Sequence, residues 1–306
     1  MRVSTVAWNG DGVDSRSISG VGFQPELVIL FRDDSGVSNY WRTSAFTGDL
    51  AINMGQGGTF ADIIQAFETD GFQVGVNANA NVLNGSYMAA CFLDNGIGGR
   101  LAVGTYSGNA TDSRNIVITP SFQPNFVVVK GNDAGLDAAW RSSAAHSTDD
   151  SEHFRETAAG ADRIQAINSD GFQVGLNADV NASGTAYYYM AMGTAGGNFA
   201  IGTYSGNNTD DRNITGIGFQ PILAIADNIT TETALSWAKL DRSVTADAHN
   251  FGGGGADSTD AIQALQSDGF QVGLAAGVNE NLSVIAWFAW IDSLGGKSGL
   301  MYKYWG

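Results

Sequence analysis

The chain has 306 residues, a formal net charge of −16 and 41 glycines, and 43% of its residues are hydrophobic. This length allows two or three domains with apolar cores, and the glycine content favours a turn-rich, all-β protein. The negative charge argues against partners such as nucleic-acid phosphates or anionic membranes. The first residues, MRVSTVAWNG, lack the apolar stretch of a signal peptide, so we expect no export signal.

Internal repetition dominates the sequence. The segments GFQPELVIL (22–30), SFQPNFVVV (121–129) and GFQPILAIA (218–226) align, and DGFQVG occurs at 70–75, 170–175 and 268–273. A period of about 98 residues is the size of a domain, whereas solenoid repeats have about 20–45 residues. We therefore expect three tandem homologous domains over residues 1–101, 102–199 and 200–306, with short joints that pack them as a pseudo-trimer.

Within a unit the signals favour strands. Turn signals recur about every 8–12 residues, as in antiparallel β-sandwiches of the jelly-roll kind. In the middle unit the expected elements are strand 102–107, turn 108–112, strand 114–118, buried strand 125–130, turn 131–135, strand 138–143, a loop that differs between copies, the DGFQVG segment at 170–175 and a closing strand at 185–192.

The DGFQVG motif has two interpretations. Its aspartate, Asp170 in the middle copy, could serve as a metal ligand or an acid repeated three times. Alternatively, Asp-Gly forms a hairpin turn in which glycine supplies a positive φ, while Phe172 and Val174 point into the core. The hairpin explains every letter of the motif, and we favour it.

Two Trp-Arg pairs are candidate contacts for a ligand or partner: Trp41 with Arg42, and Trp140 with Arg141. Indole and guanidinium groups suit sugar stacking, but a tryptophan at fixed spacing also suits an anchor between two sheets. The third copy has Trp237 followed by alanine at this spacing, so the arginine is predicted to be missing there.

Polar clusters in the middle copy raise the question of metals. Asn177, Asp179 and Asn181 alternate as calcium-loop ligands do. The first copy has three asparagines here and no carboxylate, and the third copy keeps one of the three ligands, which favours an Asn-rich turn. His146, His153 and His249 all lie in the loops that differ between copies. HSTDDSEH (146–153) would suit a surface transition metal or, by default, a solvated acidic loop. We expect no required cofactor and no catalytic constellation.

The combination of GFQP-x-x-V-x-x-K, WR-S, IQA and DGFQVG resembles a repeat of structural proteins in tailed phages and prophages. The resemblance covers essentially the whole chain, and GFQPILAIADN in the third copy departs from it by lacking the basic residue after the strand. It implies concanavalin-like or jelly-roll sandwiches, no catalytic residues, location in a virion and other virion proteins as partners.

Three functions follow as hypotheses. The first is a non-enzymatic virion protein, such as a capsid decoration protein, because the chain consists of repeats without a visible fibre stalk. The second is a carbohydrate-binding or receptor-binding tail module that contacts host-surface glycans through the variable loops. The third is a polysaccharide depolymerase, which would need a carboxylate pair that the repeats do not single out.

Overall fold

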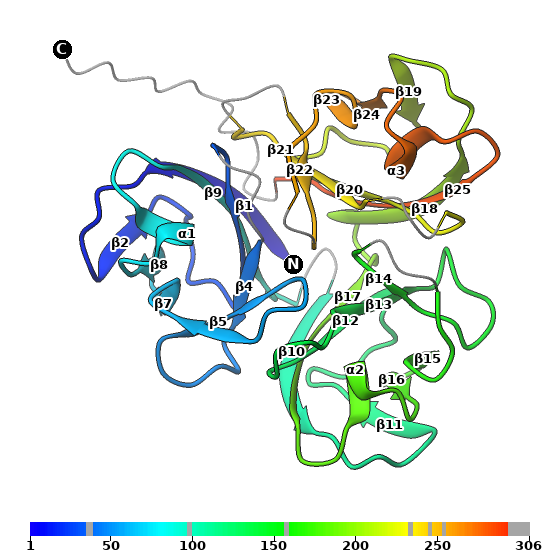
Figure 1. The fold of residues 1–306 in the computed structure, drawn as a ribbon, viewed down its shortest axis with the longest axis horizontal. Helices are drawn as coiled ribbons and strands as arrows, with labels where there is room; N and C mark the ends of the chain where they lie inside the picture. Colours follow the sequence, from blue (N-terminus) through cyan, green and yellow to red (C-terminus); the bar gives the residue numbers. More distant parts are fainter. Residues whose placement is uncertain are drawn as a thin grey trace.

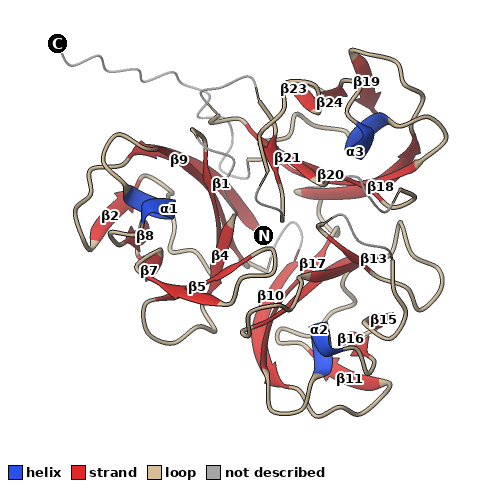
Figure 2. Cartoon of the chain, viewed as in Figure 1, coloured by secondary structure: helices blue, strands red, loops and turns tan. Residues whose placement is uncertain are grey.

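The computed structural model describes residues 1–34, 39–96, 100–155, 159–231, 235–243, 247–252 and 255–292. It confirms the all-β prediction: the described residues form six antiparallel sheets in three similar pairs, each pair a β-sandwich of one large and one three-stranded sheet. The three sandwiches lie around a common centre (Figure 1), and strands dominate all of them (Figure 2).

The first sandwich has a large sheet of order β1-β9-β3-β4-β5-β6 and a small sheet of order β2-β8-β7. Its elements are β1 (Arg2–Asn9), β2 (Arg16–Ser19), β3 (Leu27–Arg32), β4 (Tyr40–Thr43), β5 (Leu50–Asn53), β6 (Thr59–Ala61), β7 (Ile64–Glu68), β8 (Gly71–Val74), α1 (Ala78–Asn81) and β9 (Ser86–Leu93).

The second sandwich repeats this order as β10-β17-β12-β13-β14 and β11-β16-β15. Its elements are β10 (Arg100–Ser107), β11 (Arg114–Val117), β12 (Phe126–Gly131), β13 (Ala139–Ser142), β14 (Glu152–His153), β15 (Ile164–Asn168), β16 (Gly171–Val174), α2 (Ala178–Asn181) and β17 (Ala186–Gly193).

The third sandwich has the orders β18-β25-β20-β21-β22 and β19-β24-β23. Its elements are β18 (Phe199–Ser205), β19 (Arg212–Thr215), β20 (Leu223–Asn228), β21 (Trp237–Leu240), β22 (His249–Asn250), β23 (Ile262–Gln266), β24 (Gly269–Val272), α3 (Ala276–Asn279) and β25 (Val284–Trp290). The proposed unit boundaries at 101/102 and 199/200 fall within the first residues of β10 and β18.

The middle strands of each large sheet are buried on both faces. In β12, Val127 and Val129 pack towards the small sheet of their own sandwich, while Phe126 and Val128 pack into a second core built by all three sandwiches. Because neither face meets water, the strand is a continuous apolar run rather than an alternating one. The individual cores expected from the sequence are therefore joined by a fourth, central core.

The DGFQVG segment is the hairpin end of the small sheet. Phe172 and Val174 are fully buried. Gly171 has φ 158°, and a Cβ there would lie 2.0 Å from the carbonyl oxygen of Ile116 on the paired strand. The same close approach occurs at Gly71 and Gly269. The first glycine is therefore needed because a neighbouring backbone occupies the space of a side chain.

The aspartate of the motif also binds backbone. Asp70 accepts hydrogen bonds from the amides of Gly20, at 3.0 Å, and Gly22, at 2.6 Å. Asp268 accepts the equivalent pair in the third unit. In these two copies the carboxylate binds the turn that follows β2 or β19, the strand paired with the hairpin.

We predict that Gly171→Ala destabilises the chain by roughly 3 kcal/mol, because the backbone of two paired strands must separate to admit a methyl group. Gly184→Asn is the matched control: Gly184 has φ 84° with open space around it, and the first unit has Asn84 with φ 64° at this turn. Urea unfolding of both variants gives the comparison. Equal stability of the two variants would contradict the steric role.

Candidate functional site

Trp41 and Trp140 lie in the central core and are fully buried. The expectation that they fill the space between the two sheets of one sandwich is wrong, because their strands turn them to the opposite face. Trp140 donates a hydrogen bond of 2.9 Å from Nε1 to Asp227 of the third unit. These indoles hold units together, and in this position their faces are not available for sugar stacking.

The third unit differs through a shift in strand register. Ile29 is opposite Trp41 and Val128 is opposite Trp140, whereas Ile225, at the same place after the FQP triplet, is opposite Ala238. Trp237 consequently turns into the core of its own sandwich. The structural counterpart of Arg42 and Arg141 is therefore Lys239. The third unit thus lacks the arginine, as expected, but a lysine takes its place, which the sequence spacing does not show because of the one-residue shift.

These basic side chains fasten the variable loop that follows them. Arg141 is only 6% exposed and donates to the carbonyl oxygens of Thr148, Asp150 and Ile164. Arg42 donates to Gly48, Leu50 and Ile64, and Lys239 donates to Asp247 at 3.1 Å. Burial lowers the pKa of Arg141, although the nearby carboxylates of Asp150 and Asp149 act in the opposite direction.

The three histidines occupy separate places, and each faces carboxylates. His146 Nε2 lies 3.7 Å from Glu152, and its ring stands edge-on to Trp140. His153 Nε2 lies 3.0 Å from Asp179. The HSTDDSEH segment thus directs its two imidazoles to different partners. Among the described residues, no group of three His, Cys, Asp or Glu side chains is arranged to hold a metal ion.

His249 is the histidine that joins two units. Its Nε2 lies 3.2 Å from Asp33 of the first unit, and its Nδ1 lies 3.1 Å from Asp257 of its own unit. Burial lowers the pKa of His249, but the two carboxylates outweigh burial and raise it above the ordinary value. This contact lies between the first and third units, the one pair that no direct chain joint connects.

The three side chains of the calcium hypothesis form hydrogen bonds with other parts of the chain. Asn177 accepts from the amide of Asp179 at 2.8 Å and so caps α2. Asp179 accepts from the amide of Asp137 and faces His153. Asn181 is fully buried and donates to the carbonyls of Thr111 and Gly175. The three side chains thus have three different sets of partners within the chain.

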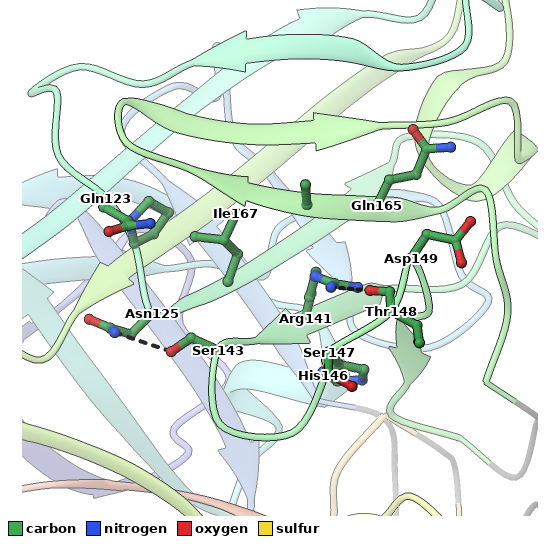
Figure 3. Close-up of a pocket in the computed structure, with 12 residues that line it drawn as sticks. Gln123, Asn125, Arg141, Ser143, His146, Ser147, Thr148, Asp149, Gln165 and Ile167 are labelled. Carbon is green, nitrogen blue, oxygen red and sulfur yellow. Dashed lines mark hydrogen bonds between the residues drawn. The ribbon is translucent and has the colours of Figure 1, made fainter.

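A cleft of about 630 Å³ opens beside Arg141 in the second unit. Figure 3 shows it between β15 on one side and the loop that follows β13 on the other, with the FQP segment at one end. Its lining consists of Gln123, Pro124, Asn125, Arg141, Ser143, His146, Ser147, Thr148, Asp149, Gln165, Ala166 and Ile167. Sequence reasoning identified Arg141, His146 and the variable loop, but not the contribution of the FQP segment and β15.

Comparisons with known proteins do not identify a family for this chain. The sequence matches no protein-family model, and it matches no curated protein. Among the described residues, none of the helices has the length and apolar character needed to cross a bilayer. The resemblance to phage repeats therefore stays a prediction.

We predict that the contact at His249 makes stability depend on pH. A raised pKa in the folded chain means that the contribution is complete below the unfolded value, near 6.5, and is lost as pH rises through the folded value. One proton changes the free energy of unfolding by at most about 1.4 kcal/mol per pH unit. Urea unfolding between pH 6 and 9 should show this loss.

His249→Gln keeps a polar side chain but cannot titrate, so its stability should vary less over the same range. Asp33→Asn removes one of the two carboxylates and should shift the wild-type transition to lower pH. Parallel curves for wild type and His249→Gln would contradict the assignment.

Proposed function

We propose that the chain is a non-enzymatic structural protein of a tailed-phage virion, and that it covers the capsid surface as a decoration protein. The observation that carries this proposal is the shared central core, through which three equivalent sandwiches become one body with pseudo-threefold symmetry (Figure 1). A single chain of this form presents three similar outer surfaces at once, which suits a position where three subunits of a shell meet.

Specific contacts at every junction support a rigid body. Between the first and second units, Phe46 stacks on Tyr188 with ring centroids 3.7 Å apart. Between the second and third units, Phe126 and Phe288 lie 4.1 Å apart. Aromatic pairs of this kind add about 0.5–1.5 kcal/mol each beyond the area that they bury.

The third junction, between the first and third units, closes the ring with polar contacts. The hydroxyl of Thr5 donates to Asp241 at 2.6 Å, and the side-chain amide of Asn39 donates to the carbonyl of Asn250 at 2.8 Å. Ser243 donates to Asp33 at 2.7 Å. Because all three junctions are closed, binding of one unit to a surface fixes the other two, which raises the effective concentration of their contacts.

The side chains best suited by type to catalysis or ligand binding support a structural role. The three histidines and the Trp-Arg pairs contact other residues of the chain and hold loops or units in place. The proposal therefore assigns them to the frame of a building block, and it places partner contacts on the outer surface.

We expect cryo-electron microscopy of virions from the encoding phage to show three-lobed density on the capsid, at threefold or quasi-threefold positions. Virions that lack the gene should lose this density, and adding the purified chain should restore it. Density confined to the tail tip would overturn the capsid assignment. Identical particles with and without the gene would overturn the virion role as a whole.

A further inference from the structure

The loop after β13 in the second unit has a different environment from its counterparts. In the first unit, Phe46 of this loop packs on Tyr188 of the second unit. In the third unit, Asp241 and Ser243 bind residues of the first unit. In the second unit Ala145 stands in the place of Phe46 and packs on the central core. Ser143, Ser147, Thr148 and Asp149 of this loop are exposed and line the cleft of Figure 3. The loop of the second unit therefore forms one wall of a cleft.

The lining of this cleft combines amides and hydroxyls. Gln123 and Asn125 present carboxamides, and Ser143 and Ser147 present hydroxyls. Gln165 and Thr148 also line the cleft, but the amide of Gln165 donates to Asp112 and Asp162, and the hydroxyl of Thr148 donates to Asp150. Asn125 is already positioned, because its amide donates to the hydroxyl of Ser143 at 3.1 Å and its carbonyl oxygen accepts from the amide of Thr194 at 2.9 Å. Groups that both donate and accept match a ligand whose hydroxyls do the same.

The charges around the cleft select against an anion. The guanidinium of Arg141 donates to three backbone carbonyls, so it binds the loop of its own chain rather than a ligand. Asp149 lines the cleft, and the next residue in the sequence, Asp150, has a second carboxylate. An anionic ligand would meet repulsion there, whereas a neutral hydroxyl can donate to Asp149 through a charge-assisted hydrogen bond.

The cleft also has a small apolar patch. Ile167 points into it from β15 (Figure 3), and the buried Pro124 is also among the lining residues. The first unit has Phe67 in place of Ile167, and the Arg42 guanidinium lies 5.8 Å from the centre of that ring. The smaller Ile167 leaves space that the first unit fills with an aromatic ring.

We propose that this cleft of the second unit binds a neutral saccharide, with hydroxyls held by the amides of Gln123 and Asn125 and by Asp149, and the C–H face of the sugar packed on Ile167. Its volume of about 630 Å³ lies within the roughly 300–1,000 Å³ of small-molecule sites. This inference goes beyond the proposed structural role and does not depend on it.

The test is a glycan array of neutral, acidic and amino sugars, followed by titration calorimetry with the selected compound. Each sugar should be present both as a terminal residue and within a chain, so that free ends and polymer interiors are distinguished. We expect selective binding of neutral glycans by the full chain. Ser147→Trp, which fills the cleft, should abolish binding, and Asp149→Ala should weaken it roughly tenfold or more.

The first unit supplies matched controls. Thr47 and Asp49 precede the carbonyls of Gly48 and Leu50 that bind Arg42, as Ser147 and Asp149 precede those of Thr148 and Asp150. Thr47→Trp and Asp49→Ala should keep the affinity of the wild type. The proposal is overturned if no neutral glycan binds selectively, if acidic or amino sugars bind better, or if the variants of both units change affinity equally.

Discussion

Burial of the middle strands of each large sheet on both faces is the constraint on which the structure depends. One face packs on the small sheet of the same sandwich, and the other packs on the remaining two units. A sandwich of about 100 residues folds around its first core, but its second face would leave a large apolar patch in water. Joining three units covers all three patches at once, in one central core.

The sequence was sufficient for the parts of the fold that depend on local patterns. The hairpin at DGFQVG was predictable because glycine and the alternation of Phe172 and Val174 report directly on backbone geometry. The continuous run at β12 correctly indicated a buried strand. It could not show what covers each face, because burial by a neighbouring unit and burial by a second sheet produce the same apolar letters.

The candidate site was less predictable, since it depends on how strands pair. Counting residues from the FQP triplet aligned Trp237 with Trp140, whereas pairing aligns Ala238 with it. A shift of one residue reverses the face of every side chain on a strand, and no composition signal reveals it. The cleft was difficult for a related reason: Arg141 and Ile167 lie on two different sheets and meet only where these sheets pack, whereas the sequence indicated Arg141, His146 and the variable loop separately.

A chain of three diverged units can also form contacts at its centre that three identical chains cannot form. Phe31, Lys130 and Asp227 occupy one equivalent position, opposite Met88, Tyr188 and Ala286. Asp227 is buried, which raises its pKa to about 7, and it is stabilised by hydrogen bonds from Ser236 and Trp140.

In a trimer of identical chains, the same side chain would occupy all three equivalent positions, and a buried aspartate would be present three times. A fused chain can supply a donor from one unit to an acceptor in the next, as Trp140 does for Asp227. Because a buried polar group needs a partner of complementary chemistry, fusion allows the centre to contain polar contacts that set the order of the units. The repeats therefore keep a common frame and diverge where they meet.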